Sequence, residues 1–470
     1  MNRMRHIIKL LLAVIVLVIL LATVPFWNHQ EISDLFEAEF DVNSYYGEET
    51  GSERVAYIDD NYEAMIYRLQ MIAEAKEEIR YSTFEIQADE SGKDVLSALL
   101  SAAERGVKVS LLTDGINALM ELNGNRWFQA FASHENVTVT IYNPRSLLKP
   151  WTLQASLHDK YMMIDDRMYL LGGRNTFDLF LGNYSAKRNI DRELFVYETG
   201  PGEPEENSSL QQLKQYNEQI LLLPDNKNYT CKKKTDKVQE AYADLLAREA
   251  HLKSTYPEAG EAADWIAKTV ATNRVSLLSN PIEPKNKEPQ VWYALCELMK
   301  QEDEITIQTP YIICGKEMYE DLADVCREAK KVNLMINDPA GGANPWGCTD
   351  YLNEQAKIRG TGVTVCEFIG SGSLHSKTLR IGERISVVGS FNLDMRSAYI
   401  DTELMLVVDS EELNDILQEE EEEYYTYCKT TADGVEYTKG ENYRERENSR
   451  LKKAAYAVLR VLIKPIRRFL

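Results

Sequence analysis

Two phrases in the sequence share one pattern, and they decide how the rest of the chain is interpreted. Residues 157–165 read LHDKYMMID and continue, after six residues, to GGRN at 172–175. Residues 374–382 read LHSKTLRIG and continue, again after six residues, to GSFN at 389–392. A single His-x-Lys phrase usually belongs to a surface strand. Its repetition in register with a glycine-containing turn that ends in Asn indicates two copies of one functional unit.

The sequence before each phrase repeats as well. Each unit holds, in order, a helical stretch, a β-rich run, a second helical stretch and two further apolar runs: 61–77, 78–84, 94–105, 107–113 and 137–142 in the first, and 291–300, 304–311, 318–330, 332–336 and 363–368 in the second. Alternation of strands with helices predicts an α/β fold. We expect two homologous halves, each a mainly parallel sheet flanked by helices, packed as a pseudo-dimer.

The duplication divides the chain into segments. We expect a first half over residues 50–200, a helical insertion or linker over 201–270, and a second half over 271–430. A run of five glutamates at 419–423 is expected to be a solvated helix face. With 470 residues and 44% hydrophobic side chains, the chain is long enough to bury a sizeable core.

Histidine and lysine two residues apart on a strand point to the same face, so each phrase offers an imidazole beside a permanent cation. If the halves meet, His158, Lys160, His375 and Lys377 surround one pocket. Such a pocket suits a phosphodiester, because the ammoniums neutralise the charge that builds on the nonbridging oxygens. The turns add neutral groups that we expect to bind substrate: Gly173, Asn175, Ser390 and Asn392.

The two imidazoles can divide the chemistry between them. One neutral imidazole can attack phosphorus, while the other, protonated, can give its proton to the departing alkoxide. No metal or cofactor is expected. The seven cysteines form no CxxC pair and lie near no histidine cluster, so they predict neither a zinc site nor a disulfide framework.

These phrases resemble the paired HKD motifs of the phospholipase D superfamily. The resemblance covers roughly residues 55–410, and the stretches 171–175 and 390–397 look most like bacterial cardiolipin synthases of the type C subgroup. It implies phosphatidyl transfer between two phospholipid molecules through a phosphohistidine intermediate. The expected lipids are phosphatidylglycerol and, as partner, a second phosphatidylglycerol or phosphatidylethanolamine.

The resemblance also implies roles for individual residues. His158 would be the nucleophile and His375 the acid/base, with the reverse assignment open, and Asp165, the acid of the first motif, would belong to the catalytic residues together with Lys160 and Lys377. Asp191 and Glu403 match the acids that orient the histidines in this family; Glu193 is the weaker alternative to Asp191.

The second motif departs from the family pattern, because Gly382 stands where an acid is expected. In the family this acid is thought to be mainly structural. The His, Lys and Asn of the second motif are all present. We therefore expect retained activity over decay of this half into a scaffold.

Both ends of the chain point to a membrane. Residues 10–27 carry no charge, about the minimum for a bilayer-spanning helix, so residues 1–28 are expected to be an uncleaved anchor, with a cleaved signal peptide as the competing interpretation. Arg3, Arg5 and Lys9 precede the span and acids follow it, which predicts a cytoplasmic N-terminus and a body outside the cell membrane. Residues 450–470 form a basic amphipathic helix that either lies on anionic lipid or docks on the acidic body.

The charge balance limits the possible partners. The net charge is -21, and removal of the ten positive charges at residues 1–9 and 450–470 leaves -31 for residues 10–449. A general nucleic-acid partner is therefore not expected. Beside the phosphatidyltransferase, three alternatives stay open: a phospholipase that releases phosphatidic acid, a membrane-anchored nuclease, and a non-catalytic lipid-binding protein. The sequence carries no signal of oligomeric state.

Overall fold

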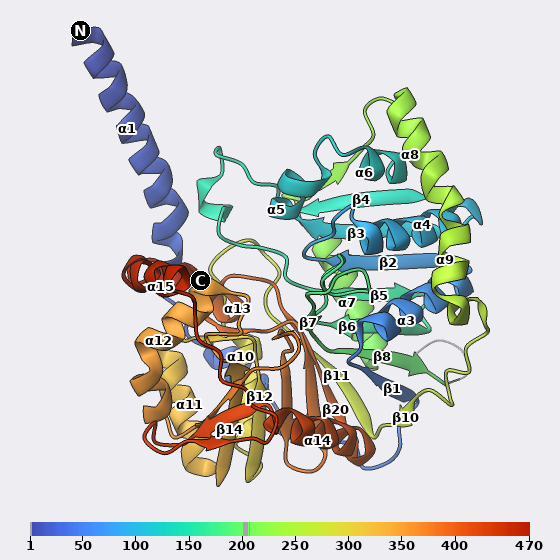
Figure 1. The fold of residues 1–470 in the computed structure, drawn as a ribbon. Coiled ribbons are helices and arrows are strands. Elements are labelled where there is room, and N and C mark those ends of the chain that lie inside the picture. Colours follow the sequence, from blue (N-terminus) through green and yellow to red (C-terminus); the bar gives the residue numbers. More distant parts are fainter. Residues whose placement is uncertain (1, 201–204, 206) are drawn as a thin grey trace.

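The computed structural model describes residues 2–200, 205 and 207–470, and it contains two nine-stranded sheets flanked by helices (Figure 1). In sheet order, the first consists of β10 (Val270–Ala271), β1 (Glu53–Ile58), β8 (Glu193–Glu198), β6 (Met168–Gly172), β5 (Tyr161–Ile164), β2 (Glu78–Thr83), β3 (Lys108–Asp114), β4 (Val137–Tyr142) and β9 (Lys227–Tyr229). The second consists of β11 (Arg274–Ser279), β20 (Leu404–Asp409), β18 (Ile385–Gly389), β17 (Thr378–Ile381), β12 (Glu304–Gln308), β14 (Lys331–Asn337), β15 (Thr364–Phe368), β21 (Cys428–Thr431) and β22 (Thr438–Lys439). From β1 and β11 onward the two orders match strand for strand, which confirms the two homologous halves.

The strand directions correct one part of the expectation. Only β2, β3 and β4 in the first sheet, and β12, β14 and β15 in the second, pair in parallel. All other neighbours in the two sheets are antiparallel, so the sheets are mixed and not mainly parallel. The reason is that each His-x-Lys phrase leads into a hairpin, β5–β6 or β17–β18. A hairpin needs only a short turn, whereas a parallel pair needs a long crossover.

Helices cover the outer face of each sheet. The first half uses α3 (Asn61–Glu74), α4 (Glu90–Glu104), α6 (Arg126–Phe131) and α8 (Asp236–Ala247), and the second uses α10 (Gln290–Met299), α11 (Lys316–Glu328) and α12 (Pro345–Gly360). The helices begin where the sequence supplies caps; Asp60 and Asp89 accept backbone N–H groups at the starts of α3 and α4. Four shorter helices lie outside these layers: α2 (Asp34–Glu39), α5 (Gly115–Asn117), α9 (Glu249–Thr255) and α13 (Met395–Tyr399). The short strand β13 (Ile312–Ile313) pairs with β19 (Leu393–Asp394).

A separate apolar layer joins the two halves. Along β6, Met168 and Leu170 point into the helix-covered core, and the alternate residues Tyr169 and Leu171 point into the cluster between the sheets. Strand β20 alternates in the same way. Helices α7 (Ser209–Leu221) and α14 (Glu411–Tyr425) complete this layer. Each large side chain buried here contributes about 1.5–3 kcal/mol, so the halves form one packed unit.

Two segments differ in detail from their sequence interpretation. Residues 207–270 hold α7, α8 and α9, but their strands β9 and β10 also extend the first sheet at its two edges. Residues 201–204 and 206 of the expected linker lie outside the described residues. Within the glutamate run, Glu420 pairs with Arg192 at 2.5 Å and Glu421 with Arg380 at 2.9 Å. Part of that run is therefore a set of buried ion pairs and not a solvated face.

Helix α1 (Asn2–Thr23) projects from the body (Figure 1). Its 22 residues span about 33 Å, enough to cross a bilayer core of about 30 Å. It is the one helix in the described residues that is long and apolar enough to do so. Just after α1, Phe26 is buried in the core of the second half. It fixes the C-terminal end of α1, which we call the foot of the helix, to the body.

The hairpin turns explain the difference between Asp165 and Gly382. Asp165 lies at the β5–β6 turn with φ of +50°, and its carboxylate accepts the backbone N–H groups of Lys76, Glu77 and Glu78 at 2.6–2.9 Å. Gly382 occupies the matching turn with φ of +60°, and a Cβ there would lie 2.5 Å from the Glu302 carboxyl carbon. Both residues lie at the end of the strand farthest from the motif histidine. Asp165 therefore supports a turn, which corrects its expected place among the catalytic residues.

We predict that Asp165→Ala lowers the free energy of unfolding by about 1–3 kcal/mol, because three backbone donors lose their shared acceptor. Activity per folded molecule should be unchanged, since the carboxylate lies at the turn. Denaturant unfolding and specific activity would be measured together. Asp166→Ala is the matched control, because Asp166 shares the left-handed backbone but makes only a surface ion pair with Lys214. A loss of activity without a loss of stability would contradict this role.

Candidate active site

At the site, a short segment of each half pairs with a segment of the other half. Strand β16 (Ser373–Leu374) of the second half pairs in parallel with β7 (Asn189–Ile190) of the first. In the symmetric position, Leu157 of the first half forms an isolated parallel bridge with Thr402 of the second. Each motif histidine therefore lies beside the acidic segment of the opposite half.

His158 is held by Glu403 from the other half. Its Nδ1 lies 2.9 Å and 3.1 Å from the two carboxylate oxygens, and its backbone N–H donates to Oγ1 of Thr402 at 3.1 Å. The hydroxyls of Ser390 and Ser397 also donate to Glu403. An ionised Glu403 accepts the Nδ1–H of His158, which leaves the lone pair of this imidazole on Nε2.

His375 is held in the same way by Asp191. Its Nδ1 lies 2.5 Å from Asp191 Oδ2, and its backbone N–H donates to the carbonyl of Ile190 at 2.7 Å. Edge-on phenylalanine rings pack against both imidazoles, Phe84 against His158 and Phe180 against His375. Both rings are thus fixed by a carboxylate on one side and an aromatic wall on another.

The two lysines complete the paired arrangement. Lys160 and Lys377 are both buried, and each ammonium donates to the backbone carbonyl of the histidine two residues before it. Lys377 also lies 3.7 Å from Asp191. Each lysine thus folds back beside its histidine, as the spacing in the sequence predicts.

Burial and the neighbouring cations set the charge state of the site. Burial, followed by the charge of Lys160, lowers the pKa of His158 well below its usual range. Burial and Lys377 lower the pKa of His375 to about 4. Both imidazoles are therefore uncharged near neutral pH before substrate binds. The charge of Lys377, and that of His375 in its protonated form, also lower the pKa of His158, so the four groups share one electrostatic environment.

The two carboxylates differ. Burial raises the pKa of Glu403 to about 8. For Asp191, Lys377 and His375 outweigh the opposing effect of burial and lower the pKa below its usual range. Asp191 is therefore the more firmly ionised of the two orienting acids.

The residues expected to bind substrate fall into two groups. The side chains of Asn175 and Asn392 are buried, and the Oδ1 atom of each has no hydrogen-bond partner among the described residues, so these amides can serve a ligand. Ser390 instead donates to Glu403. Gly173 provides space: a Cβ at this residue would lie 2.2 Å from Oδ1 of Asp191. Gly173 and Ser390 thus support the orienting acids, which corrects their expected role.

Two further residues belong to the site or its support. Ser397, which the phrase at 390–397 contains, donates to Glu403. Glu193, the weaker alternative to Asp191, is paired with Arg68 at 2.5 Å in a fully buried ion pair and does not contact a motif histidine. The family resemblance favours Asp191 over Glu193, and the fold shows that Asp191 is the acid that meets His375.

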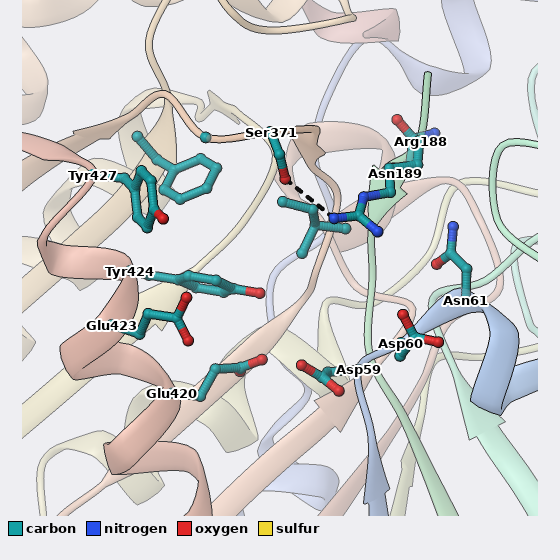
Figure 2. Close-up of a pocket in the computed structure, with 13 residues that line it drawn as sticks. Asp59, Asp60, Asn61, Arg188, Asn189, Ser371, Glu420, Glu423, Tyr424 and Tyr427 are labelled. Carbon is teal, nitrogen blue, oxygen red and sulfur yellow. Dashed lines mark hydrogen bonds between the residues drawn. The ribbon is translucent and has the colours of Figure 1, made fainter. Parts of the chain in front are cut away.

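A cavity of about 210 Å³ lies nearby, at the seam between the halves (Figure 2). Its wall includes Arg188, which donates to Ser371 across the seam at 3.3 Å. Four acids also line it: Asp59, Asp60, Glu420 and Glu423. This predominance of carboxylates repels a phosphodiester, so the phosphate site is assigned to the histidine and lysine pairs and not to this cavity.

Comparison with known families agrees with this geometry. The family model described as "Cardiolipin synthase, PLD-like domain" matches residues 69–180 and 295–425, more than half of the chain, and the two matches fall on the two halves. The chain belongs to this phospholipase D-like family.

Individual relatives extend over most of the chain. Cardiolipin synthase C of Escherichia coli (strain K12) is 24% identical over 395 residues, covering 75% of this chain and 80% of the relative. An uncharacterized protein of Helicobacter pylori (strain ATCC 700392 / 26695) is 24% identical over 414 residues, covering 75% of each chain. The crystal structure of phosphatidylserine synthase from Haemophilus influenzae Rd KW20 shares the fold, with a TM-score of 0.60 at 16% identity, covering 88% of this chain and 95% of that one.

We predict that Gly173→Ala moves the Asp191 carboxylate away from its position beside His375. The new Cβ would displace the Asp191 carboxylate, and turnover of a phosphodiester substrate should fall by about 10²–10⁴-fold, the contribution typical of general acid–base catalysis. Gly360→Ala is the control, because nothing lies within 4 Å of the Cβ position at the end of α12. Equal activity of the two variants, with equal thermal stability, would refute the positioning role of Asp191.

Proposed function

We propose that this chain is a membrane-anchored phosphatidyltransferase that makes cardiolipin from phosphatidylglycerol by transesterification. The main support is the crossed arrangement of two imidazole–ammonium pairs, each histidine held by an acid from the opposite half. Family membership and relatives named as cardiolipin synthases favour a phospholipid substrate. The apolar helix α1 would keep the site beside its lipids.

In the first step, Nε2 of His158 attacks the phosphorus of a phosphatidylglycerol molecule. A P–N bond forms as the P–O bond to the glycerol headgroup breaks. His375, protonated when the anionic substrate is bound, gives its Nε2 proton to the departing glycerol oxygen. Lys160, Lys377, Asn175 and Asn392 would stabilise the nonbridging oxygens.

In the second step, the terminal hydroxyl of another phosphatidylglycerol replaces the glycerol. His375 takes the proton of this hydroxyl, the oxygen attacks phosphorus, and the P–N bond to His158 breaks. The products are cardiolipin and glycerol. With phosphatidylethanolamine as the phosphatidyl donor, the first step releases ethanolamine in place of glycerol.

The difference between the orienting acids supports this assignment of roles. The acid/base must carry a positive charge at one stage, and firmly ionised Asp191 stabilises the imidazolium form of His375. Glu403 accepts from Ser390 and Ser397 as well as from His158, so it holds the nucleophile in one tautomer.

The position of the body relative to the membrane follows from the charges at α1. Three basic residues precede the apolar stretch, and Glu31, Asp34 and Glu37 follow it. This asymmetry favours a cytoplasmic N-terminus and a body on the outer side of the cell membrane.

The proposed activity is tested with full-length protein in vesicles that contain labelled phosphatidylglycerol, with and without phosphatidylethanolamine. Cardiolipin with equimolar glycerol or ethanolamine is the expected result, and His158→Ala should abolish it. His134→Ala is the control, because His134 contacts Glu104 of α4 and Tyr242 of α8, two helices that cover the outer face of the first sheet. Phosphatidic acid as the sole product would show a hydrolase. Cleavage of single-stranded DNA in place of lipid would show a nuclease, and the absence of turnover would leave a lipid-binding protein.

The pH dependence of kcat/KM should show an alkaline limb near pH 7. Burial lowers the pKa of Lys160 to about 7, so its positive charge is present below this pH and is lost as the pH rises above it. Since the charge stabilises the transition state, the rate should fall with it. Lys160→Arg keeps a charge at all these pH values and should move the limb upward while lowering the maximal rate. An unchanged limb in Lys160→Arg would exclude Lys160 as its origin.

A further inference from the structure

The segment between β4 and the first motif presents apolar side chains to the outside. Leu147 is 73% exposed, Leu148 88% and Trp151 47%. Single exposed leucines are common on proteins, but two consecutive leucines and a tryptophan within five residues form a compact apolar tip. We define residues 146–151 as the apolar tip.

The stem below the apolar tip is well fixed. The Asn143 side-chain amide donates to the carbonyls of Thr152 and Ala155, each at 2.8 Å, and the Arg145 guanidinium donates to Ser156 Oγ at 2.6 Å. The tip is therefore held outward by buried polar contacts, and its leucines lie outside the core.

The apolar tip lies beside the foot of α1. The 3-10 turn η4 (Pro150–Thr152) contacts α1, and Figure 1 shows this segment rising from the body alongside the helix. If α1 crosses a bilayer, residues that flank its foot lie at the height of the lipid–water interface. Tryptophan is enriched at that depth in membrane proteins.

A second apolar surface flanks the same foot. Helix α15 (Arg450–Leu462) docks on the second half through Tyr456, and Ile463, just beyond the helix, is also buried. Another side of the helix presents an exposed apolar stripe that consists of Leu451, Val458, Val461 and Leu462. After α15 in the chain, Arg468 donates to the carbonyl of Phe26 at 2.9 Å, and this hydrogen bond joins the C-terminal tail to the foot of α1. The structure thus bears out docking on the body for one side of this helix, and lipid contact through the other side stays a prediction.

The charge around these surfaces matches anionic lipid. Residues 450–470 contain seven Lys or Arg and no acid, although the chain as a whole is strongly acidic. Arg467 pairs with Asp350 and Arg468 donates to the carbonyl of Phe26, whereas Arg450, Lys453 and Lys464 are exposed. Exposed basic residues beside an anionic leaflet are each worth about 1 kcal/mol. Their place beside α1, the one described helix long enough to cross a bilayer, favours lipid as the occupant. A helix with an exposed apolar stripe and flanking basic residues is typical of interfacial binding.

We propose that the apolar tip and the exposed stripe of α15 form a lipid-contact surface that inserts into the leaflet around α1. The tip belongs to the connection that leads directly into the first motif: Asp114, which accepts the backbone N–H of Leu157 at 2.9 Å, also lies against Arg145 of the stem. Insertion of the tip would therefore set the site at the membrane surface. We give the lipid-contact surface a second role, which is to let lipid pass from the leaflet to His158. This role rests on the proposed function.

Insertion is tested by fluorescence of full-length protein in vesicles whose acyl chains carry bromine, a short-range quencher of tryptophan. The brominated lipid should quench a component of the emission that disappears in Trp151→Phe. Trp265→Phe is the control, because Trp265 is buried in the first half and its removal should leave the quenched component unchanged. An unchanged quenched component in a folded Trp151→Phe variant would overturn the proposal.

Lipid passage is tested with the double variant Leu147→Ser, Leu148→Ser. Cardiolipin formation from long-chain phosphatidylglycerol in vesicles should fall at least tenfold, and turnover of monomeric dihexanoyl-phosphatidylglycerol should be unchanged. Equal loss on both substrates, or on neither, would overturn the passage role. If the unmodified protein turns over neither lipid, the proposed function fails, and the quenching experiment still decides whether the surface inserts.

Discussion

The crossed contacts between histidines and carboxylates are the constraint on which the rest of the structure depends. His158 of the first half is oriented by Glu403 of the second, and His375 of the second by Asp191 of the first. Neither half contains a complete histidine–acid pair of its own. The site therefore exists only while the two sheets are packed together. The apolar layer between β6, β8, β18 and β20, which holds them, is as necessary to the chemistry as the motif residues are.

Burial of four charged groups in one place requires that their charges balance. Two ammoniums, Lys160 and Lys377, face two carboxylates, Asp191 and Glu403, and all four side chains are almost completely buried. A buried ion pair is destabilising when one partner is removed, so loss of any of the four leaves an unbalanced charge. Burial lowers the pKa of Lys160 and raises that of Glu403, so it favours the uncharged form of both groups while no ligand is present. A phosphodiester anion between the lysines would favour their charged form, and protonation of His375 would balance the charge of the anion.

Much of the architecture was predictable from the sequence because the duplication is visible in it. The register of two His-x-Lys phrases with their turns located the halves and the four central side chains. The sheet directions were not predictable, because a strand that enters a hairpin and one that enters a crossover have the same apolar pattern. The separate roles of Gly173 and Ser390 were also hidden, since they depend on contacts with acids that lie 13 to 18 residues away along the chain. The buried pairs of Glu420 and Glu421 were misread for a similar reason: their partners Arg192 and Arg380 are remote in sequence.

The differences between the halves would allow two similar histidines to take the different roles that the proposed mechanism gives them. A symmetric site would give both imidazoles the same affinity for a proton, and neither would be selected as nucleophile. Here the acid behind His158 is a glutamate bound by two serine hydroxyls, whereas the acid behind His375 is an aspartate that meets a glycine and a lysine. These contacts make Asp191 the stronger stabiliser of a positive imidazolium. Gly382 takes no part in this difference, because its turn lies at the far end of the motif strand, which is why the missing acid of the second motif leaves the site complete.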